Sequence, residues 1–324
     1  MTDAVSLDRA PPAGDAPPAR RPATAMTGGP AGVPETPRSS GPVPRGAPRL
    51  RTLKAILANR RTQVALAILV PILLLVILLP WLPLQAPLQT NLRAMMKPPS
   101  LTFPFGTDRM GRDVLSRTLE GVKMSLLVGF SVATVSLVFG VVLGTISGFF
   151  GKVVDRAIMT VVDIFLAFPS LLLAIGLVST IGTGIVPVIM AISLADIPRF
   201  VRLQRSLVLS LRTRAYIDAA RTVKASQRWI LTRHIVPNTI APLLVAASIA
   251  AANAILVEAS LSFLGLGIMP PEPSLGNLIR DGQTYLEQAW WISTLPGLVI
   301  LLIAFSLHFL SDGIREVLDP RSRQ

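Results

Sequence analysis

Long apolar runs with few or no charged side chains alternate with short charged segments over most of the chain. A helix needs roughly 20 consecutive apolar residues to cross the hydrocarbon core of a bilayer. Runs that reach or approach this length lie at about 64–79, 124–151, 157–181, 185–202, 239–266 and 292–310. The pattern therefore predicts an all-α polytopic membrane protein with about six transmembrane helices.

The first 48 residues differ in composition from the rest of the chain. They are rich in Pro, Ala and Gly and hold almost no large apolar side chains, so they cannot bury enough apolar surface to fold alone. We expect 1–48 to be a disordered cytoplasmic leader. We expect 49–122 to hold the first transmembrane helix and an outer segment, and 123–321 to hold the other five transmembrane helices.

The overall composition excludes an ordinary soluble domain. Of 324 residues, 51% are hydrophobic and only 15% are charged, whereas soluble proteins carry about 25% charged residues. The formal net charge of +13 does not indicate nucleic acid binding, because the Arg and Lys residues stand beside apolar runs. That distribution fixes orientation in a membrane, and it predicts cytoplasmic termini with outer segments at 82–122 and 268–290. Without Cys, the chain can form neither disulfides nor thiolate metal sites.

A polar, basic stretch from Tyr216 to Asn238 separates two apolar runs. At helical spacing its side chains divide into an apolar side and a charged side. The two sets are Tyr216, Ala219, Ala220, Val223 and Ile230 against Asp218, Arg221, Lys224 and Arg228. Pro237 fits the first turn of the next helix, where its missing N–H would be unpaired anyway. Such a surface helix can pass movement from a soluble partner into the membrane, or it is only a basic flank that fixes orientation.

The order of residues in this stretch resembles the EAA loop of ABC importer permeases. Asp218-Ala219-Ala220, then position 224, then His234-Ile235-Val236-Pro237 follow the spacing of that loop. The chain departs from the pattern where Asp218 replaces Glu, Val236 replaces Leu and Lys224 replaces Gly. If the family Gly makes a turn with positive φ, Lys224 is strained there by roughly 1 kcal/mol or more. The bend is then differently shaped, or the helix runs on.

Three further blocks resemble the dipeptide, oligopeptide and nickel branch of these permeases. They are FGTDRMGRDVLSR from Phe105 to Arg117, ILVEASLSFLGLG from Ile255 to Gly267, and SDGIREVLDPR from Ser311 to Arg321. In the first block, Asp113 is expected to be the N-cap of a helix that begins at Val114. We expect its charges to cap and orient a helix rather than to contact substrate. The resemblance covers about 60–321.

The resemblance implies an all-helical permease subunit of an ABC importer, a multi-pass protein of a prokaryotic inner membrane. Its expected partners are a sibling permease in a heterodimer, two cytoplasmic ATPases and an extracytoplasmic solute-binding protein. Di- or oligopeptides are the first choice of substrate, with nickel complexes or another small solute as alternatives. The expected ATPase-coupling interface comprises Asp218, Ala219, Ala220, Arg221, Val223, Lys224, His234 and Pro237.

No catalytic, cofactor or metal site is expected in this chain, which is therefore not predicted to be an enzyme. The only Gly-Lys pair, Gly151-Lys152, is followed by Val153 and lacks the phosphate-loop pattern GxxxxGKS/T, so ATP and Mg²⁺ are expected on the partner ATPases. His234 and His308 stand far apart in the sequence, and we expect a structural hydrogen bond for each.

Several other positions have a defined expectation. Gly140, Gly144 and Gly148 share one helix face and predict close helix packing. Asp196 is expected near the inner end of its span, in an ion pair with a nearby Arg; as a carboxylate inside a span it is also a functional candidate that could line the path. Glu258 could line a path and attract an amino group, or it could be satisfied by Ser260, Ser262 or a neighbouring helix, and both interpretations remain open.

Two other function classes fit a polytopic chain. An ion-driven secondary transporter would show midplane carboxylates in repeated halves, but no internal repeat is visible in the sequence. A membrane scaffold would need neither a small-residue packing face nor a coupling-type loop. Genes for a sibling permease and an ATPase beside this one would favour the importer.

Overall fold

The computed structural model describes residues 49–318, with side chains from 54 to 317. The predicted leader lies outside these residues. Within them the structure is helical, and its only β-type pairing is one isolated bridge between Thr107 and Asp113. The helices are α1 (Arg49–Ala58), α2 (Arg60–Leu78), η1 (Leu79–Trp81), η2 (Leu92–Ala94), α3 (Val114–Phe150), α4 (Lys152–Leu166), α5 (Ser170–Ile181), α6 (Ile185–Arg212), α7 (Ala215–Thr222), α8 (Gln227–Ile230), η3 (Leu231–Ile235), α9 (Val236–Phe263), α10 (Leu275–Gln283) and α11 (Trp291–Leu318).

Four helices in the described part of the chain are long and apolar enough to cross a membrane, or five if a bent pair counts as one span. The four are Arg60–Trp81, Val114–Phe150, Gln227–Phe263 and Trp291–Val317. Of the six expected spans, the one in α6 does not meet this criterion. The helix is 28 residues long, but its first 18 residues already contain Asp196, Arg199 and Arg202.

The third predicted span is not one straight helix. The chain bends by 91° between α4 and α5, after Leu166 and before Ser170. Pro169 explains the break, because it has no N–H to continue the α4 hydrogen bonds and it disfavours helical backbone at Phe168. The expectation of a continuous helix over 157–181 was therefore wrong.

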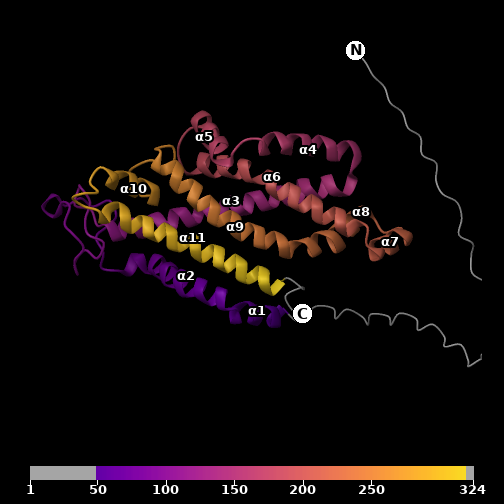
Figure 1. Ribbon diagram of the computed structural model, residues 1–324, viewed down its shortest axis with the longest axis horizontal. Helices are drawn as coiled ribbons and strands as arrows, with labels where there is room; N and C mark the ends of the chain where they lie inside the picture. The colour runs from indigo at the N-terminus through magenta and orange to yellow at the C-terminus, as the bar shows by residue number, and fades with distance from the viewer. Residues whose placement is uncertain (1–48, 319–324) are drawn as a thin grey trace, which may run out of the picture. The chain divides into compact units, whose positions relative to one another are not determined.

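The longest helix, α3, packs along α6 and α9, and α11 packs against α9 and α2 (Figure 1). The close approach of α3 to α6 depends on Gly140, Gly144 and Gly148, all of which face α6. A Cβ at Gly144 would lie 2.6 Å from the carbonyl oxygen of Val201, and one at Gly148 would lie 2.9 Å from the Cβ of Val208. The glycines therefore form the packing face that their spacing predicts.

The segment before α3 folds onto the start of α11, at the end of the bundle that holds α10 (Figure 1). Asp113 caps α3 as predicted, since its carboxylate accepts the N–H groups of Leu115 and Ser116. The helix consequently begins at Val114, so the predicted outer segment 82–122 ends in nine helical residues and the domain boundary at 122/123 falls inside α3.

Asp108, Asp113 and Arg117 of the 105–117 block are buried, whereas Arg109 is exposed. The Asp108 carboxylate accepts the N–H of Met110 at 2.8 Å and pairs with the Nε of Arg112 at 2.6 Å. Asp108 and Arg117 are each only 3% exposed. These contacts shape the segment, and Asp113 caps α3 as expected.

Candidate functional site

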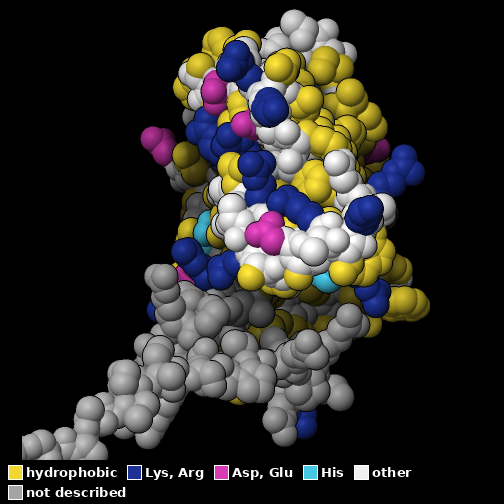
Figure 2. Space-filling view, turned by 90° about the vertical axis from the view of Figure 1, so that its right-hand side faces the viewer, with side chains coloured by type: hydrophobic (Ala, Val, Ile, Leu, Met, Phe, Trp, Pro, Cys, Tyr) yellow, Lys and Arg dark blue, Asp and Glu magenta, His cyan; other side chains and the backbone are white. Residues whose placement is uncertain are grey.

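The helices between α6 and α9 lie at the end of the bundle opposite α10 (Figure 1). We call residues 213–235, which include α7, α8 and η3, the junction segment. Lys and Arg side chains are spread over this end of the molecule (Figure 2). Exposed basic residues of the junction segment are Arg214, Arg221, Lys224, Arg228 and Arg233. The segment thus has an exposed, basic surface.

An apolar cluster fastens the junction segment to the bundle. Ile217 and Ala220 of α7 are buried together with Ile230, Ile235 and Val208, the last of which belongs to α6. Ile217 and Ala220 are three positions apart and therefore lie on one side of α7. This side anchors the short helix to α6 and to the residues that precede α9.

The opposite side of α7 is exposed. Ala219 is exposed, Val223 is 77% exposed and Tyr216 is 43% exposed. The sequence had grouped these three residues with Ala220 on one side of the helix, but the buried side is centred on Ile217, which that grouping omitted. Asp218 is also exposed and pairs with Arg221 at 3.2 Å.

Lys224 makes the turn that ends α7. Its φ is +54°. The N–H of Lys224 donates to the carbonyl of Arg221 at 2.9 Å, and the N–H of Ala225 donates to the carbonyl of Ala220 at 3.1 Å. These two bonds form the Schellman arrangement, in which the left-handed position is usually Gly. The helix does not run on: the turn keeps the shape that Gly favours, and Lys224 bears the strain.

His234 packs among aromatic rings. Its ring lies 4.6 Å from that of Trp229 in an edge-to-face arrangement and 6.0 Å from that of Tyr216. The expected side-chain hydrogen bond of His234 is not present in the described structure, whereas His308 Nδ1 meets the carbonyl oxygen of Ala304 at 2.8 Å as expected. Pro237 occupies the first turn of α9 as predicted.

Polar contacts that the sequence analysis missed tie α6 to its neighbours beside the junction segment. Asp155 of α4 pairs with Arg205 of α6, with Nη2 and Oδ2 2.7 Å apart. Arg212 Nη1 donates to the carbonyl oxygen of Gly148 on α3 at 2.9 Å. Local spacing gives no sign of these contacts, since the partners are 50 and 64 residues apart.

Glu258 is fully buried, with 0% of its surface exposed. Ser262 Oγ donates to one carboxylate oxygen at 2.7 Å, and Ser125 Oγ of α3 donates to the other at 2.9 Å. Ser260 instead donates to the carbonyl of Leu256. The structure therefore agrees with the interpretation in which the Glu258 carboxylate accepts hydrogen bonds from Ser262 and from a serine of a neighbouring helix.

The bundle of long apolar helices, with a helical junction at one end, defines the class: this is an all-helical integral membrane protein. Residues 140–324 match the family described as binding-protein-dependent transport system inner membrane component. The chain belongs to this family, whose members are the membrane permeases of ABC transport systems rather than their ATPases. Membership implies an ATPase and a binding protein as partners.

Curated relatives match over most of this chain. It is 40% identical to a putative peptide transport system permease protein of Brucella abortus, over 85% of this chain and 92% of that protein. It is 39% identical to the di/tripeptide transport system permease protein DppC of Pseudomonas aeruginosa, over 75% of this chain and 82% of that one. Among solved structures, an inward-facing MetNI methionine ABC transporter chain shares the fold, with a TM-score of 0.52 at 18% identity over 63% of this chain and 98% of that chain.

Proposed function

We propose that this chain is the permease subunit of an ATP-driven importer of di- or oligopeptides. The names of its relatives support this substrate class, since the Pseudomonas protein is a di/tripeptide permease and that of Alkalihalophilus pseudofirmus, 36% identical over 89% of this chain, is a dipeptide permease. The chain forms part of the translocation path and passes the work of ATP hydrolysis to it.

The proposed assembly contains a sibling permease as the second half of a heterodimer, two cytoplasmic ATPases that bind ATP and Mg²⁺, and an extracytoplasmic binding protein. In this arrangement α4 and α5 together make the third span and α6 makes the fourth, which gives six spans. The excess of Arg and Lys supports a cytoplasmic location for the junction segment. The α10 end then faces the binding protein.

One observation carries the coupling role: α7 has an anchored side and an exposed side. Ile217 and Ala220 hold it to the bundle, while the small side chain of Ala219 leaves room for a close partner. A rigid attachment behind a small exposed contact suits an element that must transmit displacement. Ala219, with Asp218 and Val223 beside it, is therefore the proposed centre of the ATPase contact.

Ala219→Trp tests this role. The added ring overpacks the proposed joint at a cost of about 1 to 3 kcal/mol, without touching the membrane helices. In the assembled complex we expect normal permease abundance, reduced co-purification of the ATPases and loss of peptide uptake. Asp218→Lys should act in the same direction, because it adds positive charge to an already basic surface.

Two matched variants separate docking from folding. Ala220→Trp should lower permease abundance, because Ala220 is buried in this chain's own cluster. Ala58→Trp, at an exposed Ala of α1, should leave abundance, co-purification and uptake unchanged. The coupling role is wrong if Ala219→Trp and Asp218→Lys both retain full ATPase recovery and full uptake.

The substrate class is tested separately in proteoliposomes that contain the complete complex and its binding protein. We expect ATP-dependent uptake of labelled dialanine that unlabelled tripeptides compete. Uptake of a nickel complex with no uptake of dialanine would assign the chain to the alternative substrate.

A further inference from the structure

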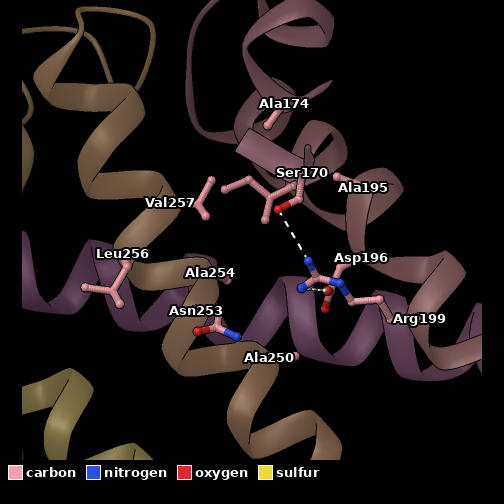
Figure 3. Close-up of a pocket in the computed structure, with 11 residues that line it drawn as sticks. Ser170, Ala174, Ala195, Asp196, Arg199, Ala250, Asn253, Ala254, Leu256 and Val257 are labelled. Carbon is pink, nitrogen blue, oxygen red and sulfur yellow. Dashed lines mark hydrogen bonds and ion pairs between the residues drawn. The ribbon is translucent and has the colours of Figure 1, made fainter. Parts of the chain in front are cut away.

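A cavity of about 300 Å³ opens between α5, α6 and α9 (Figure 3). Its volume is at the lower end of the range for small-molecule sites. The polar residues in its wall are Ser170, Asp196, Arg199 and Asn253, and much of the remainder is small apolar side chains such as Ala174 and Ala254. A neighbouring hollow of about 190 Å³ shares Asp196, Arg199 and Asn253.

The charged pair in this cavity lies near the middle of α6. Asp196 follows Ile185, the first residue of α6, by 11 residues and precedes Arg212, the last, by 16. At about 1.5 Å per residue, Asp196 is some 16 Å from the start of the helix, roughly half the thickness of the hydrocarbon core. Ionised side chains at that depth do not face lipid, so they face protein or a water-filled path.

Within the described chain, Asp196 and Arg199 make only long hydrogen bonds. Arg199 Nη1 lies 3.3 Å from Asp196 Oδ1, and Nη2 lies 3.5 Å from Ser170 Oγ. Both distances exceed the 2.7–2.9 Å usual for charge-assisted hydrogen bonds. The Arg199 side chain is 53% exposed and that of Asp196 is 15% exposed. Asn253 faces them from α9, and its side-chain amide makes no hydrogen bond with any described residue (Figure 3).

Glu258 provides a comparison, because its carboxylate is fully buried and hydrogen-bonded inside the bundle. Both of its oxygens accept short hydrogen bonds from serines and none of its surface is exposed. The Asp196–Arg199 pair has the opposite character, with long contacts, an exposed guanidinium and an open cavity beside it. Of the acidic groups inside the bundle, Asp196 and not Glu258 is therefore placed to meet a solute.

We propose that Ser170, Asp196, Arg199 and Asn253 form a contact site in the translocation path for a small zwitterion that carries a free ammonium and a free carboxylate. This proposal rests on the proposed function, for which such a solute is a short peptide. The guanidinium of Arg199 binds the carboxylate, a pairing that its planar donors favour. Asp196 binds the ammonium, and Asn253 and Ser170 supply neutral hydrogen bonds. Because the pair carries no net charge, it favours neither a simple anion nor a simple cation.

The first experiment asks whether the cavity is wet. The chain contains no Cys, so a single introduced thiol reports on one position of this subunit. In the assembled complex, Asn253→Cys should react with a charged methanethiosulfonate reagent much faster than Leu194→Cys does. Leu194 is 37% exposed on α6 but lines a different, apolar hollow. Equal reaction rates for the two thiols would show that the cavity is not open to water, which would contradict the proposal.

The second experiment measures dialanine uptake per ATP hydrolysed by the complete complex, with the loaded binding protein present. Arg199→Gln and Asp196→Asn should each lower this ratio by about 10-fold or more, since each loses a hydrogen bond to a charged group. ATP hydrolysis stimulated by the binding protein should persist. Arg202→Gln is the matched control, because Arg202 forms an exposed ion pair with Asp163 and is not part of the cavity wall.

Other outcomes overturn the proposal in distinguishable ways. If abundance, ATP hydrolysis and uptake fall together in both cavity variants, the pair only supports the fold. If only one variant lowers the ratio, the site does not recognise a zwitterion, and if neither does, the cavity is not on the path. A wild-type complex that imports no dipeptide contradicts the proposed function itself, whereas wild-type uptake with unaffected variants contradicts only this inference.

Discussion

Substitution of an α3 glycine should force α3 and α6 apart and lower the stability of the chain. In Gly144→Ala, the new Cβ would lie 2.6 Å from the carbonyl oxygen of Val201 and 2.7 Å from the Cβ of Gln204. Favourable carbon contacts begin near 3.5 Å, so α6 must move outward or strain must accumulate. Overpacking costs about 1 to 3 kcal/mol, and the gain in helix propensity from Gly to Ala returns about 0.5 to 1 kcal/mol. The expected net loss is therefore about 0 to 2.5 kcal/mol, centred near 1 kcal/mol.

The midpoint of thermal unfolding of the full-length chain in detergent measures this loss. A loss of 1 kcal/mol corresponds to roughly 2–4 °C for 150–250 residues and to less for a longer chain, so Gly144→Ala should unfold a few degrees below the wild type. Gly176→Ala on α5 is the matched control, because a Cβ there meets nothing within 4 Å. It should be neutral or slightly stabilising. If both variants unfold at the same temperature, the glycine face does not set the distance between α3 and α6.

Two further substitutions test local features. Lys224→Gly should raise the thermal midpoint by relieving about 1 kcal/mol of left-handed strain, and a lower midpoint would mean that the Lys side chain contributes more than its backbone costs. Asp155→Asn should destabilise the chain by about 1.5 to 3 kcal/mol, because it breaks the charged pair with Arg205. Asp163→Asn should cost only about 0 to 1 kcal/mol, since its pair with Arg202 is more than half exposed, and equal losses in the two Asn variants would contradict this ranking.

Features that depend on neighbours in sequence could be predicted from the sequence. Asp113 was expected to cap a helix at Val114, and it does, because a cap needs only N–H groups two and three residues ahead. Gly140 and Gly144 were expected to share a packing face, since their spacing alone sets their direction on a helix. The pairing of Asp196 with Arg199 follows from the same local geometry.

Features that depend on distant parts of the chain could not be predicted. Ser125 and Glu258 meet although 133 residues separate them, and no periodicity in either helix indicates the other. The buried side of α7 was predicted wrongly because Ile217 is buried against Val208 and Ile235, which lie on other helices. The bend before Ser170 was missed for a different reason: the apolar run continues through Pro169, and hydrophobicity alone does not report backbone direction.

The three helical segments α8, η3 and α9 follow one another directly and lead from beside α7 into the bundle. From Gln227 to Phe263 they run for 37 residues, which at 1.5 Å per residue is about 55 Å. A rigid rod of this length would act as a lever arm. A tilt of about 5° applied at one end of such a rod displaces its far end by about 5 Å, close to the diameter of a narrow pore for a small solute. Asn253 sits roughly 40 Å along that rod, so a tilt of about 5° at the base would shift the wall of the cavity by about 3 Å.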